Sequence, residues 1–507
     1  MKNKTSSLDI FPTTIIKQCY PVLSNFLLAI INSSFSSSTF PDSLKHGVVT
    51  PIIKDKTKDS NELNNYRPVC SCPFLGKLLE RSAIDQLNKH IEHQNLHAKN
   101  QSAYRKDHSC ETAIFKITGD IQHFLSNQHL VALISLDSSA AFDTVDHKIL
   151  LHRLEHDFHI TAKALKWIES FLKNRSFSVK INETESNKKQ VKYGIPQGSQ
   201  LGPLFYIPYT KHIEQIANTH GITVSMYADD TQLYLPFLPD SIHRTEDLLK
   251  ACLGDIKTFM DNSYLKLNDE KTQFTVFYPT STPFLSNPLR LRTLRNEDIV
   301  SSNELKILGI NLTPKISFQS FISKKVQSCS YHLRNLNHIK KHLPVSTRIT
   351  LVSTMVLSQL DYCNSLLIGA TGKDIKPLER ILNKAVRFIY FLNRRTHITP
   401  YLFKLHFLPI EYRIKFKVCL IGFKIKRKTA PDYLIESVQD YEPTTSINLR
   451  PGSCRDDHMF KRFPLFMSNN LLFCKLVTTW NDLPLSLRSI EIISLSSNRS
   501  LRPTYLG

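Results

Sequence analysis

The order of apolar and polar positions predicts strands in the middle of the chain and long helices after them. Residues 130–136 are apolar apart from one serine, which is typical of a buried strand. Residues 222–226 and 232–235 are rich in strand-forming residues around a short polar segment, which predicts a β-hairpin. Apolar residues at helical spacing predict a core helix at 156–173 and a series of helices over 320–430. Prolines are expected to break that series at Pro344, Pro377, Pro400 and Pro409.

Acidic residues stand at the ends of the predicted strands. Asp137 directly follows the run at 130–136, and Asp229 and Asp230 lie at the expected tip of the hairpin. Paired carboxylates suit Mg²⁺, because hard cations prefer oxygen ligands, and two such ions about 3.5–4 Å apart support an in-line phosphoryl transfer. The alternative is that Asp137 caps a following helix and the adjacent acids are ordinary turn residues.

A loop rich in glycine and proline follows at residues 193–203, with the sequence Tyr-Gly-Ile-Pro-Gln-Gly-Ser-Gln-Leu-Gly-Pro. Glycines let the backbone approach a ligand closely, and Ser199 is a candidate cap for the helix expected next. Such a loop can lie against a templating base pair. A plain turn is the alternative for this pattern taken alone.

Taken together and in this order, the motifs resemble the reverse transcriptases of non-LTR retrotransposons (LINE elements), in particular the jockey, CR1 and L2 group. The motifs that carry the resemblance are Asp137 with Ala141-Phe142, Gly-Ile-Pro-Gln-Gly-Ser at 194–199, Tyr-Ala-Asp-Asp at 227–230, Leu-Lys-Leu-Asn at 265–268 with Lys271-Thr272, and Leu-Gly-Ile at 308–310. Further stretches similar to that group lie at 50–54, 65–68, 101–105, 140–147, 360–366 (Leu-Asp-Tyr-Cys-Asn-Ser-Leu) and 480–484. The likeness extends from about residue 8 to about residue 488.

The resemblance implies an α+β fold of the right-hand polymerase type, with fingers, a palm built on an antiparallel sheet, an α-helical thumb and a C-terminal extension. The boundaries expected are 1–45 for an N-terminal extension, 46–128 for the fingers, 129–300 for the palm, 301–430 for the primer grip and thumb, and 431–507 for a weakly patterned C-terminal region. The reverse transcriptase domain would cover about 46–310. The chain begins about where the endonuclease domain of this group would have ended, so we expect that domain to be missing.

The same resemblance implies roles for single residues in an RNA-directed DNA polymerase that extends a primer 3′-hydroxyl with dNTPs. Asp137, Asp229 and Asp230 would bind two Mg²⁺ ions, with Mn²⁺ as a substitute. Lys271 would act as general acid toward the pyrophosphate. The dNTP would contact Lys54 and Arg67, which suit phosphate oxygens, together with Phe142, Gln197 and Gly198.

Two of these roles compete with simpler interpretations. Phe142 matches an aromatic gate that excludes a 2′-hydroxyl, but it is also suited to being a core aromatic. Lys54 and Arg67 are equally suited to a solvated surface.

Leu308, Gly309 and Ile310 resemble a primer grip, in which glycine allows close approach to the primer.

Charge agrees with a polyanionic partner. The formal net charge is +21 on 507 residues, and residues 321–430 hold 21 Lys and Arg against 4 Asp and Glu. We expect this segment, including Arg394 and Arg395, to contact an RNA template and DNA primer, although a solvated helix face is the alternative.

The ten cysteines form no Cys-x-x-Cys pair, so a zinc knuckle is not expected. No signal peptide or membrane span is expected, which places the protein inside the cell, in the nucleus or in a cytoplasmic ribonucleoprotein. Its protein partners are unknown.

Departures from the family pattern keep a second function open. Pro208 interrupts an expected apolar helix, and Tyr-Thr-Lys-His at 209–212 replaces a Tyr-x-Asn-Asp pattern. Further departures are Ser138, Phe259, Gln273 and Thr313. None removes a predicted metal ligand, but they suggest a drifting copy that binds RNA or an RNA–DNA duplex without catalysis. A viral RNA-dependent RNA polymerase is a weaker third reading, because Phe142 would leave no room for a 2′-hydroxyl.

Overall fold

The computed structural model describes residues 7–55, 57–139, 142–268, 271–279, 290–292, 298–441, 459–463 and 471–488. The chain divides into two compact units. The first unit contains Met1–Tyr104, Leu136–Thr231 and Asp247–Thr272, and the second contains Arg105–Ser135, Gln232–Glu246 and Gln273–Gly507. Among the described helices none is long and apolar enough to cross a bilayer. The predicted domain boundaries stay a prediction, and most of 431–507 lies outside the described residues.

The first unit is built on a sheet of short strands. Strand β1 (His46–Ile53) pairs antiparallel with β2 (Tyr66–Ser71), with Ile52 opposite Arg67, and parallel with β5 (Ser176–Ile181), with Val48 opposite Ser178. The strands β6 (Thr184–Glu185) and β7 (Lys189–Gln190) pair with β5. Helix α3 (Phe74–His93) follows β2 directly and buries an apolar stripe at helical spacing that includes Leu79, Ala83 and Leu87.

Aromatic side chains join the N-terminal helices to this unit. Helix α1 (Thr13–Gln18) leads into α2 (Tyr20–Ser36), which packs on α6 (Ala162–Leu172). Trp167 of α6 contacts the rings of Phe35 and Phe40 at centroid distances of 5.3 and 5.6 Å, and its Nε1–H donates to Ser34 Oγ at 2.9 Å. Edge-to-face contacts of this kind add to the burial of the rings.

The prediction of one helix over 156–173 is wrong at its start. Helix α5 (His147–His156) ends where that helix was expected to begin, and α6 starts only at Ala162. Between them His159 has a left-handed φ of 52°, and the Ile160 N–H returns to the Leu154 carbonyl at 2.9 Å. A left-handed residue ends a right-handed helix, and helical spacing on both sides hides such a turn from the pattern.

Pro208 does not break its helix. It lies buried inside α7 (Gly202–Thr210), and the chain continues with helical backbone through Lys211 into α8 (His212–Thr219). The next residue, Tyr209, is tied down on both sides, because its hydroxyl donates to the Ser263 carbonyl at 2.6 Å and accepts from the Asp146 N–H at 3.1 Å. Burial and these bonds offset the single backbone hydrogen bond that a proline removes.

The predicted strands form a sheet with the order β11-β3-β9-β8. Strand β3 (Leu130–Leu136) matches the run at 130–136 and pairs antiparallel with β11 (Gln273–Phe277), with Val131 opposite Phe277. The predicted hairpin is also present, as β8 (Thr223–Tyr227) and β9 (Asp230–Phe237). Short strands β4 (Ser138–Ser139) and β10 (Lys266–Leu267) pair antiparallel beyond the end of β3.

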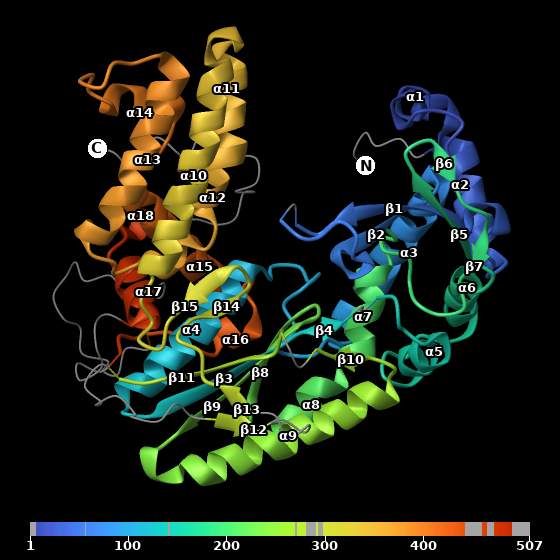
Figure 1. Ribbon diagram of the computed structural model, residues 1–507, viewed down its shortest axis with the longest axis horizontal. Helices are drawn as coiled ribbons and strands as arrows, with labels where there is room; N and C mark the ends of the chain where they lie inside the picture. The colour runs from blue at the N-terminus through green and yellow to red at the C-terminus, as the bar shows by residue number, and fades with distance from the viewer. Residues whose placement is uncertain are drawn as a thin grey trace. The chain divides into compact units, whose positions relative to one another are not determined.

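Helices dominate the second unit. Figure 1 shows α10 (Gln319–Ile339), α11 (Val345–Val352) and α13 (Gly372–Tyr390) lying side by side, and α13 packs against both α10 and α11. The chain then passes through α14 (Thr399–Leu405) and α15 (Ile410–Lys426). Pro344 and Pro409 directly precede α11 and α15 and Pro400 lies in the first turn of α14, as predicted, but Pro377 lies inside α13 without ending it.

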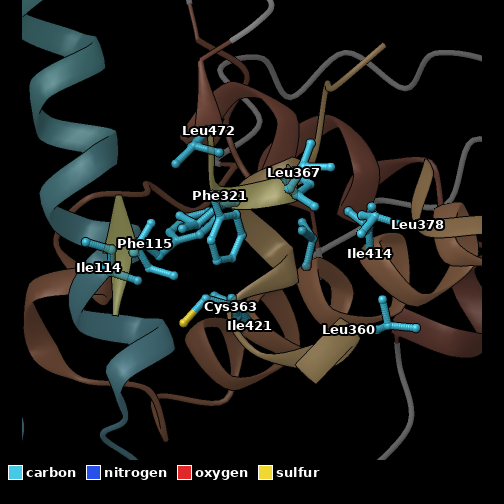
Figure 2. Packing of buried hydrophobic residues seen from close by; sticks show 14 of the residues in the cluster. Ile114, Phe115, Phe321, Leu360, Cys363, Leu367, Leu378, Ile414, Ile421 and Leu472 are labelled. Carbon is cyan, nitrogen blue, oxygen red and sulfur yellow. The ribbon is translucent and has the colours of Figure 1, made fainter. Parts of the chain in front are cut away.

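One hydrophobic core joins these helices to α4 (Cys110–Ser126). Figure 2 shows Ile114 and Phe115 projecting from α4 toward Phe321 of α10. The hairpin of β14 (Leu305–Ile307) and β15 (Ile310–Leu312) contributes its buried residues to the same core.

The remaining elements with described side chains are η1 (Asp42–Leu44), η2 (Leu63–Asn65), η3 (Pro239–Ser241), α9 (Ile242–Asn262), η5 (Lys340–His342), η6 (Ser353–Leu357), α12 (Ser358–Asp361), η7 (Asn364–Leu367), α16 (Asp432–Ile435), α17 (Leu472–Asn481) and α18 (Leu485–Arg488). The pair β12 (Arg290–Arg292) and β13 (Asp298–Val300) is antiparallel.

Candidate active site

The turn between β8 and β9 is held in an unusual backbone conformation. Ala228 at its tip has φ of 58°, in the left-handed region that costs an alanine roughly 1 kcal/mol or more. Its N–H donates to Oε1 of Gln101 at 3.1 Å, and the Gln101 side chain is buried. This amide oxygen therefore fixes the turn that carries the two acids.

A polar segment at residues 99–103 runs beside β8 and supports the turn. The Met226 N–H donates to the Asn100 carbonyl at 2.9 Å, and the Ser102 N–H donates to the Met226 carbonyl at 2.8 Å. Behind it, the buried Glu214 carboxylate accepts the N–H groups of Lys99 and Asn100 at 2.9 and 2.8 Å. Buried carboxylates with backbone donors are strong anchors, so the position of the turn is well determined.

The two acids of the turn lie in a crowded electrostatic environment. Burial raises the pKa of Asp229, and the charge of Asp137 raises it further, while Arg67 and Lys271 oppose the shift. Burial raises the pKa of Asp230 to about 6, with the charges of Asp229 and Asp137 adding to the effect. Like charges held this close favour a bound cation, because a cation relieves their repulsion.

Asp137 joins this cluster from the end of β3. Its carboxylate pairs with the Lys271 ammonium at 2.9 Å, and its carbonyl accepts the Asn268 N–H at 2.9 Å. The pairing of β4 with β10 brings these two segments together. Asp137 does not cap the following helix, because α5 is capped by Asp146, whose Oδ1 accepts from the Lys148 and Ile149 N–H groups.

The carboxylates fit a hard divalent cation by chemistry and charge. Oxygen ligands and net negative charge are what Mg²⁺ requires. Within the described residues, however, no three His, Cys, Asp or Glu side chains converge as a closed metal site. In this structure Lys271 supplies the positive charge next to Asp137.

The loop at 193–203 packs against strand β2. The Gln197 side-chain amide donates to Asp143 Oδ2 at 2.7 Å, and the backbone carbonyl of Gln197 accepts the Cys70 N–H at 2.7 Å. Gly198 has φ of 142°, and a Cβ there would lie 2.0 Å from the Cys70 carbonyl oxygen. Only glycine fits at that position, because the contact is with backbone that cannot move aside.

A buried acid holds the other side of this loop. Glu80 on α3 is fully buried, and its Oε2 accepts from Ser199 Oγ at 2.7 Å and from the N–H groups of Gln200 and Leu201 at 2.5 and 3.3 Å. Burial raises the pKa of Glu80, and the three donors together with the charge of Arg175 oppose that shift. The prediction that Ser199 caps the next helix is wrong, because the N-cap residue of α7 is Leu201 and no side chain caps that helix. Ser199 Oγ instead accepts the Leu201 N–H at 3.1 Å within the loop.

Phe142 is half-buried and lies beside the loop. Its ring contacts that of Tyr206 at 5.1 Å, and its carbonyl accepts the Ile195 N–H at 2.8 Å. The pKa of Tyr206 is raised by burial, with further contributions from the charges of Asp229 and Asp137. Phe142 thus contacts a tyrosine that interacts electrostatically with the acids, and its partial burial agrees with either of its predicted roles.

The two predicted phosphate-binding cations lie on β2 and just after β1. Both are exposed, and Arg67 interacts with Asp229 whereas Lys54 interacts with Asp143. Lys54 Nζ donates to the Asn64 carbonyl at 2.8 Å. All nine residues predicted for metal binding, acid catalysis and dNTP binding belong to the first unit, and they are Lys54, Arg67, Asp137, Phe142, Gln197, Gly198, Asp229, Asp230 and Lys271.

The predicted primer grip and the predicted nucleic-acid contacts lie in the second unit. Leu308 and Gly309 form the two-residue turn between β14 and β15, and Ile310 begins β15. Arg394 and Arg395 are exposed in the turn after α13. Part of the basic charge of 321–430 is used within the unit, since Arg413, Lys417 and Lys424 pair with Asp361, Glu111 and Asp107.

Four supporting residues were missed by the sequence reasoning: Glu80, Gln101, Asp143 and Glu214. Glu80 and Glu214 left a signal, because each is a charged residue on an otherwise apolar helix face and each is buried. Such positions need partners, and the partners are found far away in sequence. Gln101 and Asp143 lie in irregular segments that give no periodic signal.

The family model for reverse transcriptase (RNA-dependent DNA polymerase) matches residues 53–312, which is half of the chain. The chain belongs to the reverse transcriptase family. This match and the mixture of helices and sheets confirm the predicted α+β fold of a right-hand polymerase. Reverse transcriptases generally use divalent metal ions, in agreement with the acid cluster.

Known relatives of this reverse transcriptase are polymerases of mobile elements. It is 25% identical over 317 residues to a probable RNA-directed DNA polymerase from transposon BS of Drosophila melanogaster, covering 61% of this chain and 34% of the relative. It is 26% identical over 309 residues to the RNA-directed DNA polymerase from mobile element jockey of the same species, covering 60% and 32%. The chain thus spans about a third of the length of these relatives. The predicted likeness to the jockey group is confirmed.

Two solved telomerase structures are also similar to this reverse transcriptase. The telomerase of Candida albicans in complex with a fragment of telomeric RNA has a TM-score of 0.41 and 11% identity, covering 84% of this chain and 64% of that one. The apo telomerase of Candida tropicalis, truncated from its C-terminal domain, has a TM-score of 0.38 and 12% identity, covering 58% and 59%.

Proposed function

We propose that this chain is an RNA-directed DNA polymerase of a LINE-type retrotransposon, which extends a primer 3′-hydroxyl with dNTPs along an RNA template. The observation that carries the proposal is the electrostatic interaction of Asp137, Asp229 and Asp230 with one another and of Asp229 with Arg67, in the same unit as a rigidly held Gln197-Gly198 loop. Family membership supports the same reaction.

The acids would hold two Mg²⁺ ions, or Mn²⁺ in their place. Such ions, when bound, stabilise the charge on the attacking and leaving oxygens of phosphoryl transfer. Arg67 interacts electrostatically with Asp229, which supports a role for its guanidinium in binding the triphosphate beside the acids. Lys271 pairs with Asp137 at 2.9 Å and would donate a proton to the departing pyrophosphate.

The loop would supply a flat surface for the template base and the incoming nucleotide. Gln197 is locked by Asp143, and Gly198 presents backbone with no side chain. Because both sides of the loop are bonded, little conformational freedom remains to be lost when the base pair forms. This rigidity supports a role in positioning.

The direct test is primer extension. Purified protein with an RNA template, an annealed DNA primer, Mg²⁺ and dNTPs is expected to yield extended primer, and omission of the divalent ion is expected to abolish it. Binding of the duplex without any extension, in Mg²⁺ or Mn²⁺, would contradict the proposal. That result would instead support the second candidate, a nucleic-acid binding protein without catalysis, which is favoured by Lys211 and His212 in place of the expected Asn-Asp.

Replacing Phe142 with valine is expected to raise incorporation of ribonucleotides relative to deoxynucleotides, by roughly tenfold or more. The reason is steric, since a smaller side chain leaves room for a 2′-hydroxyl beside the acids. The measurement is the ratio of kcat/KM for dNTP and rNTP with each variant.

Phe35→Val is the matched control, because Phe35 is also half-buried with one aromatic neighbour at 5.3 Å, yet lies on α2 away from the acids. An unchanged ratio in Phe142→Val, with the same loss of stability in both variants, would make Phe142 a core aromatic.

Duplex binding is expected to weaken steeply with salt, because phosphate contacts release counterions at a log–log slope of about −0.9 per phosphate on B-form DNA. Replacing exposed Arg394 and Arg395 with glutamine is expected to make the slope shallower by roughly one to two units, with little change in sequence preference. Fluorescence anisotropy over a salt series measures this.

The control is Lys461→Gln with Arg462→Gln, an exposed basic pair outside 321–430 that changes the net charge equally. If both double variants show the same dependence of duplex affinity on salt, Arg394 and Arg395 belong to an ordinary solvated surface and do not contact the duplex.

A further inference from the structure

The turn at Leu308-Gly309 has a demanding backbone conformation. Ile307 pairs with Ile310, so only two residues connect β14 and β15. Leu308 has φ of 47° and Gly309 has φ of 79°, both in the left-handed region. Two-residue hairpins use such conformations, but leucine adopts them at a cost. A contact from outside the hairpin is therefore expected to stabilise Leu308.

Tyr362 makes that contact. Its hydroxyl donates to the Leu308 carbonyl at 2.6 Å. Its ring also covers the second turn residue, because a Cβ built on Gly309 would lie 3.7 Å from both Cε1 and the hydroxyl oxygen of Tyr362. One side chain thus holds the carbonyl of the first residue and packs on the second.

The backbone of Tyr362 is itself anchored to α10. The ammonium of Lys325 donates to the Tyr362 carbonyl at 2.7 Å and to the Gln359 carbonyl. Lys325 is 7% exposed, and burial lowers its pKa to about 8. The following residue, Cys363, is buried and left-handed with φ of 49°, which turns the chain sharply after Tyr362.

The neighbours of Tyr362 in the motif at 360–366 are held within the second unit. The side chains of Leu360, Cys363 and Leu366 are buried in its core, and the Asp361 carboxylate accepts two hydrogen bonds from Arg413, at 2.7 and 2.5 Å. Tyr362 is 40% exposed and directs its hydroxyl to the hairpin. A rigid segment thus presents one polar group to a strained turn.

We propose that Tyr362 is a positioning residue that holds the Leu308-Gly309 turn in the conformation that receives the primer strand. The inference rests on the proposed polymerase function and gives the motif at 360–366 a role in it. Tyr362 acts through the turn, so its loss affects how well a bound primer is aligned and not how tightly the duplex binds. Alignment errors of this kind lower the rate of the bound complex.

Tyr362→Phe tests the proposal by removing only the hydroxyl. We expect kcat for primer extension to fall about 5- to 20-fold, since one hydrogen bond of ordinary net strength changes an equilibrium by about fivefold or more. The KM for dNTP and the affinity for duplex are expected to stay within about twofold. Tyr331→Phe is the control, because Tyr331 is an exposed tyrosine of α10 in the same unit. Unchanged kcat in Tyr362→Phe would overturn the proposal and leave the polymerase function intact.

A double-mutant cycle separates positioning from general destabilisation. Gly309→Ala disturbs the same turn directly, because φ of 79° disfavours alanine. If Tyr362 acts through the turn, the double variant is expected to be little worse than Gly309→Ala alone. If the fold-losses in kcat of the two single variants multiply in the double variant, Tyr362 and Gly309 act independently, and the proposal that Tyr362 acts through the turn is contradicted.

Hydrogen–deuterium exchange gives a readout that does not depend on activity. Tyr362→Phe is expected to increase exchange in a peptide covering 305–312, and Tyr331→Phe is not. In the parent protein, an RNA template with an annealed DNA primer is expected to protect that peptide. Absence of this protection would overturn the role in primer positioning even if no extension occurs, whereas protection without extension would count only against the polymerase function.

Discussion

Replacing Asp229 with asparagine is expected to lower primer extension by roughly three orders of magnitude while leaving the fold stable or slightly more stable. Loss of activity follows because a preorganised charge at the reacting phosphate commonly contributes that much to a rate. Stability is expected to hold or rise because burial raises the pKa of Asp230 and the charges of Asp229 and Asp137 raise it further by repulsion, so removing one charge relieves part of this strain. A cluster of like charges that lowers the stability of the folded protein is typical of a functional site, because activity often requires groups that stability alone would not favour.

Extension assays and thermal unfolding with and without Mg²⁺ measure both effects. Mg²⁺ is expected to raise the melting temperature of the parent but not of Asp229→Asn, because only a folded state that binds the ion gains stability from it. Asp261→Asn is the control, since Asp261 is an exposed acid of the same unit. Near-parent extension by Asp229→Asn would show that these acids are turn residues and no more.

Replacing Glu80 with alanine is expected to lower the free energy of unfolding by about 3 kcal/mol and to impair extension together with it. The reason is that the Ser199 hydroxyl and the N–H groups of Gln200 and Leu201 lose their buried acceptor, at about 1–3 kcal/mol for each unsatisfied group before relaxation. Glu80→Gln keeps one acceptor oxygen, so we expect a smaller loss.

Urea unfolding of both variants measures the effect, and Glu92→Ala is the matched control because Glu92 is exposed on the same helix. Burial raises the pKa of Glu80 above its ordinary value of 4.5, so the parent loses part of its stability as the pH rises from 4.5 through the raised pKa. Glu80→Gln is expected to lack that component. A loss below about 1 kcal/mol in Glu80→Ala would mean that water replaces the carboxylate.

Local patterns predicted the elements that carry the acids. The run at 130–136 is strand β3, and the hairpin at 222–235 is formed by β8 and β9. Prediction failed where one residue changes the backbone against a favourable pattern, as at His159 between α5 and α6. It also failed at Pro377, because α13 is strongly amphipathic and begins with a capping box at Thr371, which offsets the lost hydrogen bond.

The sequence by itself determined the family and the fold class, and its resemblance to the family predicts which side chains are chemically active. Family and fold class depend on residue type and order, because strands follow from apolar runs and the family motifs from the order of their residues. Only the tertiary structure revealed what holds those groups in place: Gln101 at the acid turn, Glu80 under the loop, and Tyr362 on the Leu308-Gly309 turn. Each of these contacts joins residues far apart in the chain, and a hydrogen bond between distant residues leaves no periodic trace in one sequence.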